Sequence, residues 1–332
     1  MPRQSVLLTA ALAGTTCASL AAPEAPGLPL LGGGTMPIAG LGLAGSTYRE
    51  ILDFLLMGGR HLDTAIIYSS ARAAGQAIRE AMRQGVRREE VFFTHKLNGA
   101  VMGLDGVLWA MPRMLQQSGL DYFDLVLLHG PRKELDRCLT PKRCRQESWL
   151  ALQRFKSQGL VKHMGVSNYG PRQMEELLAM GGAPVEVNQL EYHPWSPQAN
   201  REAVAYCHAR GIAVTAYSSV SALHARPEAE VRAVSAIAAA HNRTAAQVLL
   251  RWALQHNVSV IPHSSRPQHM AQNLEVFDFA LGREQMAVLD AMPPGAALHP
   301  QNRLDGDDWP PPEWGSYSLD HALPEVERQY LS

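Results

Sequence analysis

Residues 61–97 read HLDTAIIYSSARAAGQAIREAMRQGVRREEVFFTHKL and contain the unit from which most of the chain is built. The short runs His61–Ala65 and Val91–Leu97 have the length and apolar content of buried strands. Between them, Ala71–Arg83 places apolar residues at helical spacing, and Gly85 follows where a helix would return to a strand. A strand, a helix and a second strand in this order predict two parallel, neighbouring strands.

The same unit recurs along residues 28–295, with no low-complexity linker between its copies. Eight runs are strand candidates: Ile38–Leu43, His61–Ala65, Val91–Leu97, Asp124–His129, Lys162–Ser167, Val185–Glu191, Ala213–Ser218 and Ser259–Pro262. Eight strand–helix units predict an α/β fold of the (β/α)8, or TIM barrel, type. The alternative is an open doubly wound sheet with a glycine-rich phosphate-binding turn after an early strand; the eight regular units favour the barrel.

Two segments flank the barrel pattern. Leu28–Leu31 and Met36, on either side of three glycines, predict an N-terminal β-hairpin that plugs the lower end of the barrel. Residues 1–27 are either a targeting leader or a disordered Ala-rich tail, since Arg3 precedes the apolar run Val6–Gly14. We therefore expect one domain over residues 28–332, including a C-terminal loop or tail at 296–332.

The composition excludes several partners. Among 332 residues the formal net charge is -1, so no overall field favours nucleic acid or an anionic membrane. No stretch approaches the roughly 18 apolar residues that a membrane span needs. Four cysteines are present, and only Cys138 and Cys144, in the basic stretch 132–145, are close enough in sequence to suggest a disulfide. Ordinary loop thiols are the preferred interpretation of this pair, and Cys207 is expected to be a packing residue.

Polar residues that end apolar strands are the candidates for chemistry, because the active site of such a barrel lies at the carboxyl ends of its strands. Asp63, Lys96 and His129 end three consecutive strands, and Tyr68 follows one of them after a short turn. A tyrosine is a weak acid with a pKa of about 10, and a nearby cation lowers that value. We therefore expect Tyr68 to donate a proton, Lys96 to favour its phenolate and Asp63 to hold Lys96. His129 would bind the substrate oxygen or share in the proton transfer.

Each of these residues has an ordinary alternative role, such as helix capping for Asp63 or packing for His129. A different enzyme class is also open, because His and Asp at strand ends can bind metals in hydrolases. His61, Asp63, His129, His163 and His193 are the residues concerned. Lys96 would place a cation beside that metal, so we expect no metal site.

Several motifs in order along residues 28–290 resemble the aldo-keto reductase superfamily. They are Gly59-Arg60-His61-Leu62-Asp63-Thr64-Ala65 with Tyr68 and Gly75, Leu160–Asn168, Asn188-Gln189 with His193-Pro194, Gly211–Ser218 and Val276–Phe279. The resemblance implies a (β/α)8 barrel and the reduction of aldehydes and ketones with NADPH or NADH. It places the catalytic tetrad on Asp63, Tyr68, Lys96 and His129. It also implies a cytoplasmic monomer, although the possible leader leaves secretory or organelle entry open. A non-catalytic, nicotinamide-binding redox sensor is the second alternative.

The resemblance also assigns cofactor residues. Ser167, Asn168 and Gln189 would bind the nicotinamide carboxamide, Tyr217 would stack on the ring, and Ser218 would face the pyrophosphate. At the adenosine end the sequence departs from the family's basic residues; its candidates there are His263, Ser264, Arg266, His269 and Asn273. Neutral histidines bind phosphate weakly, but Arg266, together with Ser264 and Ser265, can supply part of the missing charge. NADPH is therefore expected, with NADH as the alternative.

The substrate pocket is expected to be wide. Two positions that often carry Trp in the family hold Ala44 and Gly130, and Asn98 follows the lysine strand. Trp309 and Trp314 could return from the tail to supply apolar surface, or could only anchor the tail.

Overall fold

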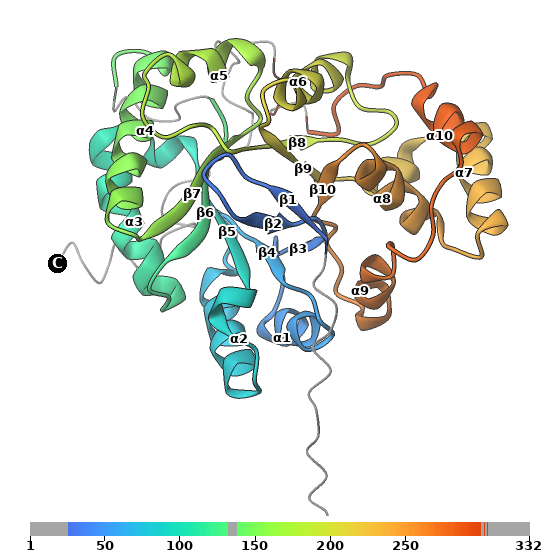
Figure 1. Cartoon of the computed structure of the whole chain (residues 1–332), viewed down its shortest axis with the longest axis horizontal. Helices are drawn as coiled ribbons and strands as arrows, with labels where there is room; N and C mark the ends of the chain where they lie inside the picture. Colours follow the sequence, from blue (N-terminus) through green and yellow to red (C-terminus); the bar gives the residue numbers. More distant parts are fainter. Residues whose placement is uncertain (1–25, 132–137, 300–301, 303, 305–332) are drawn as a thin grey trace, which may run out of the picture.

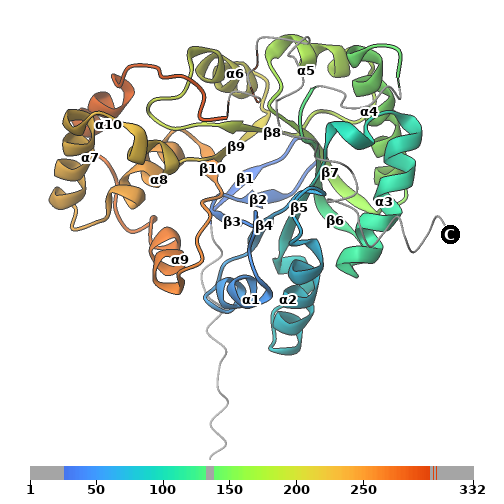
Figure 2. The same cartoon turned by 180° about the vertical axis from the view of Figure 1, so that it is seen from behind.

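A computed structural model of the chain describes residues 26–131, 138–299, 302 and 304. Eight parallel strands form a closed barrel, and helices surround it (Figures 1 and 2). The strands follow one another in chain order from β3 to β10. A bridge between Ala39 and Val260 closes the ring, and the Val260 amide donates to the Ile38 carbonyl at 2.9 Å. The expected (β/α)8 barrel is confirmed.

The elements have the following bounds. The strands are β1 Gly27–Pro29, β2 Thr35–Pro37, β3 Gly40–Gly42, β4 His61–Asp63, β5 Phe92–Leu97, β6 Phe123–Leu128, β7 Val161–Ser167, β8 Val187–Glu191, β9 Ala213–Tyr217 and β10 Val258–Val260. The α-helices are α1 Tyr48–Leu56, α2 Ala71–Arg83, α3 Leu104–Ser118, α4 Pro141–Ser157, α5 Pro171–Leu178, α6 Gln198–His208, α7 Glu228–Ala240, α8 Ala245–Gln255, α9 Pro267–Leu274 and α10 Arg283–Asp290. Three 3₁₀ turns are η1 Arg88–Glu90, η2 Gly99–Val101 and η3 Ser221–Ala225.

The strands alternate with helices because the same few residue types end each element. Thr47, Thr140 and Thr244 cap the amino ends of α1, α4 and α8 with their side chains, which satisfies free backbone amides there. Gly119 ends α3 in the left-handed conformation. A Cβ on Gly75 would lie 1.7 Å from the Ser118 carbonyl oxygen, so this glycine lets α2 approach the end of α3. The signature glycine at position 75 is thus a packing residue.

The N-terminal hairpin is confirmed and is tied to the barrel by one buried carboxylate. β1 and β2 are antiparallel, and the hairpin lies across the middle of the barrel in Figure 1. Glu186, just before β8, accepts from the Gly32 amide at 2.9 Å, from His163 at 2.7 Å and from Lys156 at 2.9 Å. Because Glu186 precedes its strand, the hairpin occupies the end of the barrel where the strands begin.

Several predicted bounds were wrong by a few residues at the strand ends. β4 stops at Asp63 rather than Ala65, and β10 spans Val258–Val260 rather than Ser259–Pro262. The Thr64 and Ile66 amides still donate to carbonyls of the neighbouring strand, at 2.9 and 3.0 Å. The chain therefore continues along β5 before it turns. In the described part of the chain no helix is long and apolar enough to cross a membrane.

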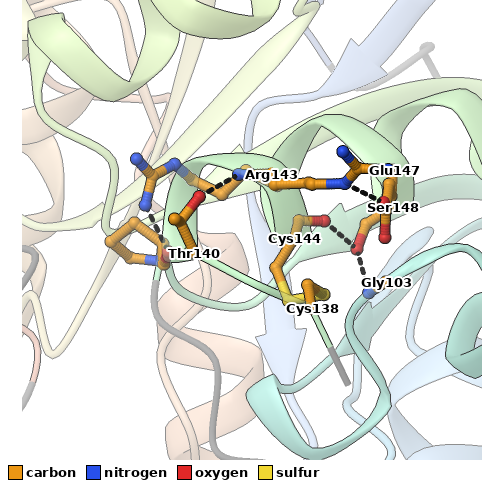
Figure 3. Close-up of a disulfide and its surroundings, with 9 residues drawn as sticks. Gly103, Cys138, Thr140, Arg143, Cys144, Glu147 and Ser148 are labelled. Carbon is orange, nitrogen blue, oxygen red and sulfur yellow. Dashed lines mark hydrogen bonds and ion pairs between the residues drawn. A yellow bond between two sulfur atoms is a disulfide. The ribbon is translucent and has the colours of Figure 1, made fainter. Parts of the chain in front are cut away.

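The interpretation of Cys138 and Cys144 as loop thiols was wrong, because they form a disulfide with Cα atoms 5.3 Å apart. Cys144 also lies in the first turn of α4 rather than in a loop. Figure 3 shows Ser148, one turn later, donating to the Cys144 carbonyl and accepting from the Gly103 amide, both at 2.7 Å. The bond thus closes the chain leading from β6 onto the start of α4. Cys207 is a buried packing thiol, as expected.

Candidate active site

The buried floor of the candidate site is an ion pair. Asp63 ends β4 and Lys96 lies near the end of β5; both side chains are almost fully buried and they contact each other. Lys96 Nζ also donates to the Thr64 carbonyl at 3.1 Å, and Gln189 Nε2 donates to the second Asp63 oxygen at 2.8 Å. A buried charge is stable only when paired and hydrogen-bonded. The contacts meet this condition, and Asp63 does hold Lys96 as the sequence predicted.

Tyr68 lies in the turn after β4, above this pair. Its half-buried ring is 5.1 Å from Lys96 Nζ and stands edge-on to the His129 ring, with centroids 5.8 Å apart. Burial raises the pKa of Tyr68 above its ordinary value; Lys96 opposes this effect and Asp63 adds to it. The expectation that the net pKa would fall was therefore wrong, because loss of solvent outweighs the ammonium. At neutral pH Tyr68 is a phenol that still carries its proton.

His129 follows β6 and is the third polar group around Tyr68. Burial, with added repulsion from Lys96 and His95, lowers the pKa of His129 to about 3. The ring is therefore neutral at physiological pH, and its Nδ1 has no hydrogen-bond partner among the described residues. A neutral ring can orient an oxygen by a hydrogen bond, but it does not hold the spare proton that an imidazolium would carry.

The residues expected to bind nicotinamide form one hydrogen-bonded group at the ends of β7, β8 and β9. Ser167 Oγ and the Asn168 amide both donate to the Gln189 carbonyl, at 3.0 and 2.9 Å. Asn168 Nδ2 donates to the His129 carbonyl at 3.0 Å, and the Tyr217 hydroxyl donates to Asn168 Oδ1 at 2.7 Å. The structure thus places these side chains beside the catalytic candidates.

Two residues of this group have left-handed backbone. Asn168 has φ 61° and Ser218 has φ 55°. Asn tolerates this region, whereas for Ser it costs free energy, and such strain concentrates at functional sites. At Ser218 the chain turns out of β9 towards η3, which explains why the strand ends at Tyr217.

The residues proposed for the adenosine end lie further away, after β10. Ser264 is buried, and its hydroxyl accepts from the Arg266 amide at 3.2 Å at the start of α9. His263, Arg266 and His269 are exposed, and Asn273 is half-buried on α9. The structure therefore gathers this set around one helix end, but without the buried contacts of the catalytic group.

The residues expected around the substrate lie at the same end of the barrel. Ala44 is exposed after β3, while Asn98 and Gly130 are half-buried after β5 and β6. A Cβ added to Gly130 would meet no atom of the described residues within 4 Å, so the space beside it is open in this part of the structure. Trp309, like Trp314, lies outside the described residues.

Comparison with known proteins now identifies the chain. The model of the Aldo/keto reductase family matches residues 31–293. The chain belongs to this family. It is 38% identical over 272 residues to an aldo-keto reductase of Mycolicibacterium vanbaalenii, covering 80% of this chain and 91% of the relative. It is 34% identical over 296 residues to morphine 6-dehydrogenase of Pseudomonas putida, covering 85% and 96%.

Solved structures of the family agree with the fold. The aldo-keto reductase of Bombyx mori, in complex with NADP, is 31% identical, with a TM-score of 0.74 over 82% of this chain and 94% of that one. An aldo-keto reductase complexed with NADPH is 28% identical, with a TM-score of 0.77 over 86% and 96%. The chain is therefore an oxidoreductase of this family on a TIM barrel.

Family membership excludes the metal-dependent hydrolase that the sequence left as an alternative, and the histidines of that pattern have structural roles. His61 contacts the Pro37 carbonyl and Thr94 Oγ, both at 3.1 Å, inside the barrel. His163 bonds Glu186 at the amino-terminal end of β8, whereas His193 bonds Glu191 at the other end. These rings are spread along the barrel and each has a structural partner.

Sequence reasoning missed three residues that touch the site. Glu191 ends β8 beside Tyr217 of β9, and Asn302 Nδ2 donates to the Tyr217 hydroxyl at 3.0 Å. His299 Nε2 lies 3.1 Å from Ser218 Oγ. Glu191 was visible as a charged residue ending an apolar strand, the criterion that found Asp63. No sequence signal marked His299 or Asn302, because their position depends on how the C-terminal segment returns.

Proposed function

We propose that this aldo/keto reductase reduces aldehydes or ketones to alcohols, with NADPH as reductant and Tyr68 as proton donor. The observation that carries the proposal is the convergence on the Tyr68 ring of His129, at 5.8 Å between centroids, and Lys96, at 5.1 Å. Asp63 neutralises Lys96 below them. A proton donor, a buried cation and a neutral hydrogen-bonding ring around one point suit the protonation of a carbonyl oxygen.

The donor set beside Tyr68 fits a nicotinamide. A carboxamide needs both hydrogen-bond donors and acceptors, and the Asn168 and Gln189 side chains offer both. The Tyr217 ring is fixed through its hydroxyl and provides a flat apolar surface of suitable size. When bound, the nicotinamide would supply a hydride to the carbonyl carbon.

The protein side of the reaction follows from the protonation states. The Tyr68 hydroxyl, kept protonated by burial, gives its proton to the carbonyl oxygen. The phenolate left behind is stabilised by Lys96, whose charge matters more in a buried site than in water. Neutral His129 orients the carbonyl oxygen by a hydrogen bond. Asp63 keeps Lys96 in place through the transfer.

NADPH is the proposed reductant because Arg266 lies at the start of α9, beside the buried Ser264 hydroxyl. A guanidinium there can pair with a 2′-phosphate, which NADH lacks. The relatives solved with NADP and NADPH agree with this choice.

A substrate wider than a short aldehyde is proposed from the rim of the site. Ala44, Asn98 and Gly130 are small or polar, and the space next to Gly130 is open. Such a rim admits bulky carbonyl compounds and offers little aromatic surface to a small one.

The test is a panel of carbonyl substrates, from propanal to 4-nitrobenzaldehyde and cyclic ketones, run in parallel with NADPH and NADH. We expect faster turnover with NADPH and with the larger substrates. Tyr68→Phe should lower kcat about 10²–10⁴-fold with little change in Tm, because it removes only the proton donor. The matched control is Tyr206→Phe, whose hydroxyl bonds Glu175 on the surface; it should keep full activity. A Tyr68→Phe enzyme with half the original rate would exclude the proposed mechanism.

A further inference from the structure

Glu191, at the carboxyl end of β8, is a buried carboxylate outside the expected catalytic and cofactor residues. It is 1% exposed. His193 Nε2 bonds it at 3.1 Å, and the backbone amides of Leu298 and His299 donate to it at 2.9 and 3.3 Å. A buried carboxylate is held by such donors and orders them in turn. Glu191 therefore fixes a chain segment more than 100 residues away in sequence.

That segment reaches the candidate nicotinamide site; we call Leu298, His299, Asn302 and Leu304 the C-terminal segment. The His299 ring lies 5.8 Å from the Tyr217 ring, and its Nε2 is 3.1 Å from Ser218 Oγ. Asn302 Nδ2 donates to the Tyr217 hydroxyl at 3.0 Å. Leu304 is buried. Tyr217 is thus held from both sides, by Asn168 of the barrel and by Asn302 of the segment.

We propose that Glu191 is a positioning residue for the nicotinamide site, acting through the C-terminal segment on Tyr217 and Ser218. This inference rests on the proposed function, in which Tyr217 stacks on the nicotinamide. By accepting hydrogen bonds from the Leu298 and His299 amides, Glu191 positions the His299 and Asn302 side chains against Ser218 and Tyr217. In this proposal Glu191 acts through its two hydrogen bonds to the segment and not by contact with cofactor or substrate.

The direction of the effect follows from the hydrogen-bond chain. If Glu191 releases the segment, Asn302 no longer restrains the Tyr217 hydroxyl, and the ring must be ordered again when the cofactor binds. That ordering reduces affinity for the cofactor. Tyr68 follows β4 and Lys96 lies on β5, so both keep their contacts, and the substrate's KM should change less than the cofactor's Kd.

The test uses the full-length protein and titrates it with NADPH, following quenching of tryptophan fluorescence. In Glu191→Gln an amide group replaces one acceptor oxygen, and a backbone amide loses its partner. We expect the Kd for NADPH to rise about tenfold, and about as much in Asn302→Ala. In the double variant the rise in Kd should be only slightly larger than in either single variant and much smaller than the product of the two rises, because both substitutions act through one path. A fully multiplicative double variant would contradict this path.

Glu186→Gln is the matched control, because it changes another buried glutamate that bonds a histidine and distant backbone amides. It should lower Tm but leave the Kd for NADPH within twofold of the original. An equal rise in Kd in Glu186→Gln would overturn the inference, since general loosening would then explain the effect. So would an unchanged Kd in Glu191→Gln.

Asn302→Ala, at a half-buried position, decides the question if Glu191→Gln does not fold: an unchanged Kd there would also exclude the inference. Failure of the proposed function looks different. In that case the unaltered protein would bind neither NADPH nor NADH.

Discussion

The two ends of strand β8 carry the same arrangement of groups with different consequences. At the amino-terminal end, Glu186 bonds His163 and captures the Gly32 amide of the N-terminal hairpin. At the carboxyl end, Glu191 bonds His193 and captures the Leu298 and His299 amides. Both carboxylates are almost fully buried. Two glutamates five residues apart, each bonded to a histidine, thus bind two different remote segments to the barrel.

The difference lies in what each captured segment touches. The hairpin held by Glu186 buries its own apolar side chains, Leu28 and Met36, at the end of the barrel where the strands begin. The segment held by Glu191 bonds Tyr217 and Ser218. In a TIM barrel the amino-terminal end serves stability and the carboxyl end serves chemistry. The same group of atoms therefore supports folding at one end and, as we propose, cofactor binding at the other.

The largest change in stability that tests this difference between the two ends is expected from Glu186→Ala. It leaves Lys156, His163 and two backbone amides without their common acceptor. Removing one partner of a buried ion pair costs about 3–5 kcal/mol, and partial exposure of Lys156 favours the lower value. Urea unfolding should show a loss of about 3 kcal/mol, while kcat and NADPH affinity at 25 °C stay unchanged.

Glu175→Ala is the control for this loss, because its carboxylate pairs with Arg210 at the surface. It should leave the midpoint of urea unfolding nearly unchanged, because solvent screens an exposed ion pair. If Glu186→Ala altered NADPH affinity without altering stability, the assignment of the two ends would be reversed.

The comparison also shows how far the sequence leads. Hydrophobic runs with interposed helical patterns specify the barrel, because parallel strands buried on both faces read as short apolar stretches. Asp63, Lys96 and His129 were found because they end such runs. The sequence can equally mislead: Gly40, Gly42 and Gly45 have the spacing of a dinucleotide-binding turn, yet Gly40 and Gly42 belong to β3. A Cβ on Gly42 would lie 2.9 Å from the Ile261 carbonyl oxygen, so this glycine serves barrel closure.

What the sequence did not yield depends on long-range geometry. The net pKa of Tyr68 requires its burial, which no local pattern states. Cys138 and Cys144 could be free thiols or a disulfide until the start of α4 was known. His299 and Asn302 reach Ser218 and Tyr217 in a segment that Glu191 binds from more than 100 positions earlier in the chain. Contacts of this kind are set by the return of the chain, and the periodicity of a segment says nothing about them.

A smaller loss of stability is expected on breaking a third link, the Cys138–Cys144 disulfide, which lies after β6 at the carboxyl ends of the strands. It closes a short loop, for which chain entropy gives about 2 kcal/mol. Next to it, Arg145 donates to the Pro131 carbonyl at 2.8 Å, two residues after His129. Reduction by dithiothreitol should lower the free energy of unfolding in urea by about 2 kcal/mol. The variant with both cysteines replaced by Ser should have the stability of the reduced protein, with or without reductant. Equal unfolding midpoints of the original protein with and without reductant would contradict this role.

The smallest effect concerns the acid side of stability, where the two glutamates should behave alike. Burial alone would raise the pKa of Glu186 and of Glu191, but hydrogen bonds lower both below the ordinary value, from His163 and Lys156 in one case and from His193 and two backbone amides in the other. A carboxylate with a lower pKa in the folded state contributes stability that is complete above its unfolded pKa of about 4.3 and is lost as the pH falls through the folded value.

Glutamine cannot titrate, so the stability difference between the original protein and either Glu→Gln variant should shrink between pH 5 and pH 3. The slope should stay below that of one proton, about 1.4 kcal/mol per pH unit. His95 and His129, each with a pKa lowered to about 3 chiefly by burial, destabilise all three proteins below pH 6.5, and this contribution cancels in the difference. Urea unfolding of the original protein and both variants at pH 5, 4 and 3 measures this stability difference. A constant difference in Glu191→Gln beside a shrinking one in Glu186→Gln would mean that the two ends of β8 differ in their electrostatics as well as in what they hold.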